Sequence, residues 1–316
     1  LNLDFTLFDK AVTRKKGKGF LVIECSLKGE RLKLMFNLQF GTEEWDHVFT
    51  QWILAITNHL KEMGISEDEV CFSFFSLDKR DDWDTVERLC HTASLVRKVN
   101  PRIKILADYG YKDPQCKYEY HTKAITAVLP FVDIVAVPHQ RLLNEKELDL
   151  LRTSKKRIWS YTSNHYGYDH MIHSRNLCAY GSYRIPFWRV FALQLDGCAV
   201  YSSTRWRGDP WNDWYFVDNT FSYDEATHEQ CTVYNGLSGP ITSRRWEAWR
   251  MGAEDYAFLH MLKEEIANNE DAQHYESLLQ EACKEVIEKS NHPELATQWR
   301  WRIIEALLAL RSSHGR

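Results

Sequence analysis

Hydrophobic and polar positions follow two different spacings along this chain. Short, almost continuous apolar runs predict strands that are buried on both faces. Longer segments between them repeat apolar residues every three or four positions, as amphipathic helices do. The runs interpreted as strands occupy residues 19–25, 70–78, 103–110, 131–139, 157–163, 197–203 and 231–236. The alternating stretch 31–40 is a further candidate for a strand or a hairpin arm.

Segments with helical spacing lie between the apolar runs. One of them ends at Gly64, a residue that commonly stops a helix. Helices are predicted at residues 5–16, 43–64, 83–100, 120–130, 144–154, 171–195 and 243–266, with two more after them. In the final predicted helix of the chain, the apolar stripe that a docking helix needs is formed by Trp299, Ile303, Ile304, Leu307 and Leu308.

The regular alternation of strand and helix predicts an α/β fold in which βαβ units pair the strands in parallel. We expect a (β/α)8 TIM-like barrel with a C-terminal helical appendage, and a doubly wound open sheet is the alternative. The expected division is a barrel over residues 1–265 and helices packed on it over residues 266–316.

In such a barrel the active site lies where the strands end, at their C-terminal edge. Several predicted strands end in polar side chains that would meet there. Asp133 instead begins its strand, at the opposite edge, and is therefore expected to be structural. The polar residues at or just after the C-terminal strand ends are Asp78, Asp108, Tyr109, His139, Tyr161, Asn164 and Tyr201.

Aromatic residues are abundant, with 12 Trp, 15 Tyr and 15 Phe. Such residues fill cores, and flat rings also stack on the apolar faces of sugars. Trp206, Trp211 and Trp214 lie close together in a single loop after a predicted strand. A loop can hardly bury three indoles in its own core, so we expect at least one of them to be a platform for a sugar.

Charge and cysteine content narrow the function classes. The net charge of −4 indicates no basic surface for nucleic acid. No apolar run reaches the roughly 18 residues of a membrane-spanning helix. The 8 cysteines are scattered without a CxxC pair, which favours buried thiols over a disulfide framework. Asp169, His170 and His173 could hold a metal, but such a cluster without a metal-site motif is more often surface, so no metal is expected.

Some of the carboxylates have a simpler interpretation. Asp78 could cap the helix predicted at residues 83–100 instead of serving a site. Asp81, Asp82 and Asp84 suit the first turn of that helix, where the helix dipole favours negative charge. On the residues alone, both interpretations of Asp78 stay open.

Five segments of the chain resemble, in order, the pattern of one protein family. They are VDIVAVPH, RIWSYTS, LDGCAVYSSTRWRGDPWNDW, VYNG and SRRWEAWRMGAEDYAFLHML. The Asp-Pro-Trp with its flanking tryptophans and the Arg-x-Glu-x-x-Arg-x-Gly-x-Glu-Asp-Tyr series are the most specific parts. The family is domain of unknown function 4091, which forms the catalytic barrel of β-N-acetylgalactosaminidases in glycoside hydrolase family 123. The similarity runs from about Asp78 to Leu262, and more loosely back to Phe5.

The resemblance implies a retaining mechanism that is assisted by the substrate. In this family the 2-acetamido oxygen attacks the anomeric carbon, an Asp orients the acetamido group, and an adjacent Glu protonates the leaving oxygen. Asp78 matches the Asp, whereas Lys79 stands in place of the Glu. A lysine, with an ordinary pKa of about 10.4, is a poor acid for this step. Asp108 is therefore the first candidate to replace the acid, and Asp82 is the second.

The resemblance implies a glycoside hydrolase that acts on 2-acetamido glycans of the β-GalNAc type. We expect a glycan partner, no cofactor, and a monomer or weak homo-oligomer. The expected catalytic residues are Asp78, Asp108 and Lys79. The expected substrate-binding residues are Tyr109, His139, Tyr161, Asn164, Tyr201, Trp206, Trp211, Trp214 and Arg245. A carbohydrate-binding barrel that has lost its acid and a metal-dependent hydrolase are the two alternatives.

Overall fold

The computed structural model describes residues 3–17, 20–24, 37–76, 83–108, 118–162, 183–200, 204–205, 230–269, 272–290 and 292–314. By their internal contacts the residues divide into two compact units, Leu1–Ile158 and Trp159–Arg316.

The first unit is built on parallel strands in sequential order. They are β1 (Leu21–Glu24), β2 (Val70–Ser76), β3 (Lys104–Asp108) and β4 (Ile134–Pro138). Each strand pairs in parallel with the next one along the chain. Every residue of β4 is buried, as expected for a strand covered on both faces.

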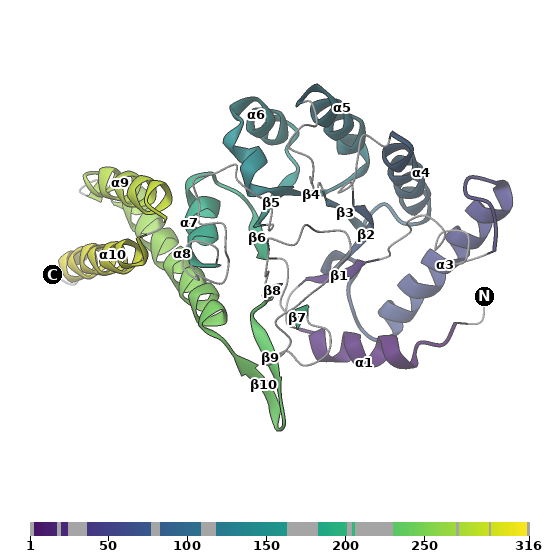
Figure 1. Ribbon diagram of the computed structural model, residues 1–316, viewed down its shortest axis with the longest axis horizontal. Coiled ribbons are helices and arrows are strands. Elements are labelled where there is room, and N and C mark those ends of the chain that lie inside the picture. Colours follow the sequence, from purple (N-terminus) through teal and green to yellow (C-terminus); the bar gives the residue numbers. More distant parts are fainter. Residues whose placement is uncertain are drawn as a thin grey trace, which may run out of the picture. The chain divides into compact units, whose positions relative to one another are not determined.

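Helices lie before, between and after these strands along the chain. They are α1 (Thr6–Lys15), α3 (Glu43–Glu62), α4 (Trp83–Val99), α5 (Tyr118–Val128) and α6 (Glu145–Thr153), with short 3-10 helices η1 (Glu67–Glu69), η2 (Leu129–Phe131) and η3 (His139–Leu143). Figure 1 shows α4, α5 and α6 on the same side of the strands. Sequential strands with their crossover helices on one side are the winding of a barrel, whereas a doubly wound sheet carries helices on both faces.

The longest of these helices, α3, shows how the apolar spacing becomes a core. Thr42 caps its first turn by accepting a hydrogen bond from the backbone N–H of Trp45 at 3.3 Å. The rings of Trp45 and Phe49 stack with their centroids 4.9 Å apart. The buried residues recur every three or four positions: Trp45, Phe49, Ile53, Ile56 and Leu60.

Asp133 ties the N-terminal edge of the strands together. Its Oδ2 accepts hydrogen bonds from Arg97 Nη2 at 2.5 Å and from the backbone N–H of Ile105 at 2.8 Å. Its backbone N–H donates to the carbonyl of Ile105 at 2.9 Å. The structural role predicted for this residue is confirmed.

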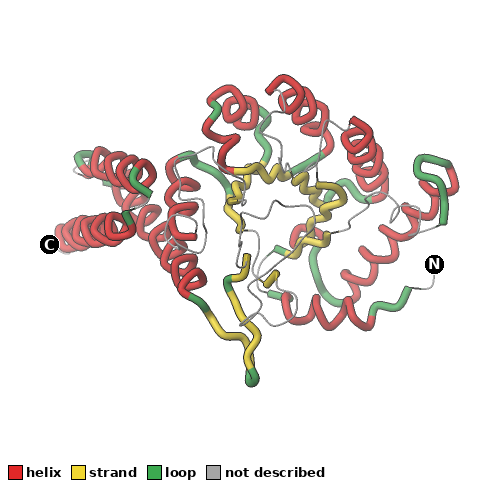
Figure 2. Tube along the Cα trace, in the orientation of Figure 1, coloured by secondary structure: helices red, strands yellow, loops and turns green. Residues whose placement is uncertain are grey.

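The sheet continues through β5 (Arg157–Thr162) to β6 (Gly197–Val200), and the strand order is β1-β2-β3-β4-β5-β6. Figure 2 draws these strands in yellow. The predicted α/β fold with parallel strands is confirmed. The described residues contribute six strands to this sheet, so closure into an eight-stranded barrel stays a prediction.

The run at residues 231–236 was predicted as another strand of this sheet, and that prediction is wrong. It forms β9 (Val233–Gly236), which pairs antiparallel with β10 (Gly239–Thr242). The preceding β8 (Gln230–Cys231) pairs antiparallel with β7 (Thr204–Arg205). Only residues 237 and 238 separate β9 from β10, and so short a loop between paired strands makes a hairpin instead of a crossover.

The described residues of the second unit also form four packed helices. They are α7 (Ile185–Ala192), α8 (Arg244–Asn268), α9 (Tyr275–Glu288) and α10 (Pro293–His314). Each of α8, α9 and α10 packs on the other two, and their apolar faces form one core with α7. The docking role predicted for the last helix is confirmed by Trp299, Ile303 and Leu307, which are all buried in that core.

Leu308 departs from the predicted stripe, because it is 61% exposed. The physical reason is the pitch of the helix. At about 3.6 residues per turn, a residue nine positions after Trp299 has turned about half a revolution away from it. The buried face instead includes Ala306 and Leu310.

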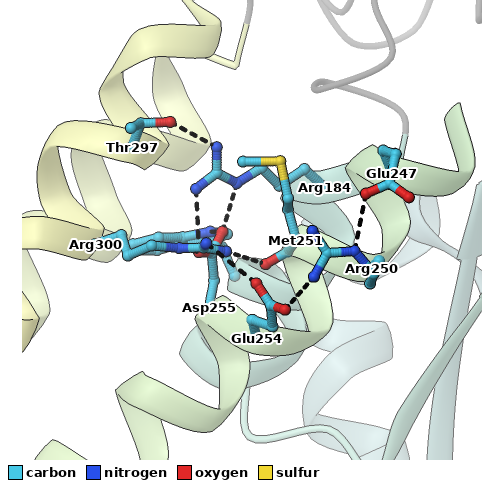
Figure 3. A network of polar contacts seen from close by, with 9 residues as sticks. Arg184, Glu247, Arg250, Met251, Glu254, Asp255, Thr297 and Arg300 are labelled. Carbon is cyan, nitrogen blue, oxygen red and sulfur yellow. Dashed lines mark hydrogen bonds and ion pairs between the residues drawn. The ribbon is translucent and has the colours of Figure 1, made fainter. Parts of the chain in front are cut away.

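A buried ion network joins the helices of the second unit (Figure 3). Asp255 of α8 accepts two hydrogen bonds from Arg184, at 2.6 and 3.1 Å, and one from the indole of Trp188 at 2.8 Å. Arg300 of α10 donates to the same carboxylate at 2.5 Å, and Arg184 also donates to Thr297 of α10 at 2.8 Å. Both carboxylate oxygens of Asp255 are thus satisfied by charged and polar donors.

Candidate active site

Two of the predicted site residues lie at neighbouring strand ends in the first unit. Asp108 is the last residue of β3 and is paired in register with Ser76, the last residue of β2. On its other side Asp108 is paired with Ala136 of β4, and His139 follows the end of that strand directly. Asp108 and His139 therefore emerge at the same C-terminal edge, as the strand assignments require.

Burial gives these two groups different environments. His139 begins η3 and is 4% exposed, with its Nδ1 atom buried. Asp108 is partly exposed, while its Oδ1 atom is buried. A carboxylate that reaches both the interior and the solvent can bind a polar ligand or exchange a proton with it.

Tyr161 occupies the corresponding place in the second unit. It is the second-last residue of β5, is half-buried, and is paired in register with Ala199 of β6. Since β6 ends at Val200, Tyr161 lies at the C-terminal end of this strand pair. A phenol there can offer both a ring face and a hydroxyl to a ligand.

Arg245 is held by a residue that the sequence did not single out. Its Nη2 donates a hydrogen bond to the hydroxyl of Tyr234 on β9, and its guanidinium carbon lies 5.8 Å from the centre of that ring. Ser243 caps α8 and accepts a hydrogen bond from the backbone N–H of Arg245 at 3.2 Å. The β9–β10 hairpin thus helps to orient the guanidinium at the start of α8.

The remaining predicted site residues lie outside the described residues, and their roles stay predictions: Asp78, Lys79, Tyr109, Asn164, Tyr201, Trp206, Trp211 and Trp214. The possible metal cluster of Asp169, His170 and His173 lies outside them as well. Within the described ranges, no group of three or more His, Cys, Asp or Glu side chains is placed to hold a metal ion. None of the described helices is both long and apolar enough to cross a membrane.

A buried carboxylate near this edge was missed by the sequence analysis. Glu147 lies in the first turn of α6 and is only 1% exposed. Burial raises the pKa of its carboxyl, and Arg141, whose Nη1 is 3.7 Å from Oε1, acts in the opposite direction. The available signal was the position of Glu147 beside Leu148 on the apolar face of the helix, together with Leu151.

The chain matches the family model of the glycoside hydrolase 123 catalytic domain over residues 22–262, which is most of its 316 residues. The chain belongs to this glycoside hydrolase family. The resemblance inferred from the sequence is thereby confirmed. No curated protein matches the chain significantly.

The match places the candidate residues within a glycoside hydrolase 123 catalytic domain. It begins in β1 and ends within α8, so it includes the strand ends that carry Asp108, His139 and Tyr161. Arg245 lies inside the match as well, while α1, α9 and α10 lie outside it. A glycoside hydrolase domain implies that the substrate is a glycan.

Proposed function

We propose that this glycoside hydrolase 123 protein cleaves β-linked 2-acetamido sugars of the GalNAc type, with retention of configuration. The observation that carries the proposal is the family match over residues 22–262, which spans the strand ends where the polar candidates lie. The substrate type and the mechanism follow from the family resemblance, and the register of β2 and β3 supports the choice of residues.

In the proposed mechanism the substrate supplies its own nucleophile. The acetamido oxygen attacks the anomeric carbon as the glycosidic bond breaks, and water then opens the oxazolinium ion. Asp78 orients the acetamido group and stabilises the positive charge of this intermediate. Two successive displacements at one carbon restore its original configuration.

Asp108 is proposed to protonate the leaving oxygen, because Lys79 occupies the position of the family acid. The register between β2 and β3 supports this choice. Asp108 is paired with Ser76, and Asp78 follows Ser76 by two residues along the chain. Asp82 is the second choice for the acid.

Hydrolysis of a nitrophenyl β-GalNAc tests this assignment. Such an activated leaving group needs little protonation, so we expect it to be the best substrate. Asp78→Asn should abolish turnover. Asp108→Asn should lower kcat about 10²- to 10⁴-fold on a glycan with a poor leaving group and far less on the nitrophenyl glycoside. If Asp78→Asn has full activity, the catalytic site lies elsewhere.

A carbohydrate-binding protein is the second candidate function, and the identity of Lys79 favours it. In that case the wild type binds 2-acetamido sugars in calorimetry but cleaves none of them. Lys79→Glu would then restore the family acid and should create activity. Measurable turnover by the wild type on any 2-acetamido glycoside excludes this alternative.

A further inference from the structure

Glu147 lies eight residues after His139 along the chain. His139 begins η3, and Glu147 lies in the first turn of α6, the helix that follows. β4 ends at Pro138, η3 begins at His139, and α6 begins at Glu145. Asn144 caps α6, and its side chain accepts hydrogen bonds from the backbone N–H groups of Lys146 at 3.0 Å and Glu147 at 3.4 Å. The first turn of α6 is therefore fixed directly against the end of η3.

Arg141 connects the two short elements by both its backbone and its side chain. Its carbonyl accepts a hydrogen bond from the backbone N–H of Asn144 at 3.1 Å. Its Nη1 lies 3.7 Å from Oε1 of Glu147, and the side chains are only 16% and 1% exposed. Because water screens this pair little, the attraction between the two charges is stronger than at the surface.

The buried negative charge of Glu147 depends on Arg141 for compensation. No described residue donates a hydrogen bond to either oxygen of its carboxylate. A buried carboxylate without hydrogen bonds is costly unless a cation compensates it, and among the described residues Arg141 is placed to do so. An apolar side chain would fill this place on the buried face of α6 at a lower cost, so packing alone does not account for a carboxylate here.

We propose that Glu147, acting through Arg141, is a positioning residue that holds η3 in the shape that presents His139 to the bound glycan. This inference rests on the proposed function, since it takes His139 to contact the substrate. A short 3-10 helix has poor internal hydrogen bonds, so its shape depends on side-chain contacts such as this one. Leu142, 2% exposed, also anchors η3 by burial.

The test compares Glu147→Gln with Glu145→Gln. Both substitutions replace a carboxylate by an amide of the same shape in the same helical turn, and Glu145 is exposed. For the nitrophenyl glycoside, Glu147→Gln should raise KM several-fold with kcat nearly unchanged, which is the pattern of lost substrate binding. Glu145→Gln should leave both constants as in the wild type.

A second measurement does not depend on activity. In protein labelled on its histidines, the imidazole resonance that disappears in His139→Asn identifies His139. That resonance should shift in Glu147→Gln and stay in place in Glu145→Gln. Arg141→Gln breaks the same pair from its other partner and should shift it too, and this variant serves if Glu147→Gln does not fold.

The outcomes separate the two ideas. If no 2-acetamido glycoside is cleaved, the proposed function fails, while the His139 resonance still decides whether Glu147 positions η3. If the resonance is unchanged in both Glu147→Gln and Arg141→Gln, the positioning role is overturned. A shifted resonance together with an unchanged KM in an active enzyme also overturns it, because His139 then moves without consequence for the glycan.

Discussion

The carboxylate of Asp255 accepts hydrogen bonds from three side chains, those of Arg184, Trp188 and Arg300. Both Asp255 and Arg184 have no exposed side-chain surface. A single substitution in a buried ion pair has a large effect on stability. The remaining partner is then a buried charge that neither water nor an opposite charge compensates. Exposed pairs on the same helix, such as Arg250 with Glu247, lack this property.

Asp255→Asn should therefore destabilise the protein strongly. It removes the negative charge between two arginines, and breaking a buried ion pair in this way costs about 3–5 kcal/mol. The free energy of unfolding in urea measures the effect. Glu247→Gln on the same helix is the control and should change it little. A loss below about 1 kcal/mol for Asp255→Asn would mean that water reaches the network.

Glu147 should make stability depend on pH in a direction unusual for a carboxylate. Its pKa is raised in the folded protein, so the folded state holds the proton more tightly than the unfolded chain does. The stability it contributes is present below the unfolded pKa of about 4.3 and is lost as pH rises through the folded pKa. Glu147→Gln mimics the protonated form and should gain stability over the wild type as pH increases.

Denaturation of the two proteins at a series of pH values checks this. Glu145→Gln, at an exposed position, should show no such trend. A constant difference between Glu147→Gln and the wild type across the pH range would contradict the prediction. A gain in stability joined to a loss in substrate binding would fit a residue kept for its role in positioning.

At the scale of elements, the contact between α7 and α8 depends on a close approach at Gly252. A Cβ atom added there would lie 2.4 Å from Cδ2 of Phe187 and 2.8 Å from the carbonyl oxygen of Arg184. The carbonyl belongs to backbone that is anchored by the ion network, so it cannot shift easily. This contact explains why a glycine occupies the middle of a long helix, where alanine is otherwise preferred by about 1 kcal/mol.

Gly252→Ala should consequently destabilise the protein by about 1–3 kcal/mol, the cost of overpacking, despite the better helix propensity of alanine. Thermal and urea unfolding measure the change. Ala253→Ser, at the exposed neighbouring position, is the matched control and should cost at most about 0.5 kcal/mol. A stabilised Gly252→Ala would show that α7 and α8 can move apart freely.

At the scale of the whole molecule, the family match ends at residue 262, yet the second unit continues through α9 and α10. The core around Leu259 and Ile266 of α8 is closed by residues of both later helices. Arg300 and Thr297 of α10 also complete the hydrogen bonds around Asp255 and Arg184. These helices therefore belong to the same folded unit as α8.

A chain that ends at residue 268 keeps all of α8 and loses α9 and α10. We expect it to be insoluble, or to lack the fixed aromatic environment seen in near-ultraviolet circular dichroism, because the apolar face of α8 is uncovered. A chain ending at residue 314 is the control and should fold normally. A soluble, cooperatively unfolding protein of residues 1–268 would show that the last helices are an independent appendage.

Local patterns in the sequence were sufficient to predict the parallel strands β1 to β6, most of the helices, and the placement of Asp108 and His139 at one edge. Strand and helix periodicities depend on near neighbours, and the direction of a parallel strand decides which of its ends faces the site. The family resemblance came from the sequence as well. It rests on motifs, and a motif does not show which side chains contact one another.

The tertiary structure alone decided which polar groups are buried and what they contact. Asp255 appeared as one of several charges on α8, and its partners Arg184 and Arg300 are 71 and 45 residues away. Glu147 is buried because other segments of the chain cover α6. The strand at residues 233–236 pairs with the strand that follows it in a hairpin and not with the parallel sheet. Burial and pairing depend on contacts between distant segments, which no pattern of neighbouring residues records.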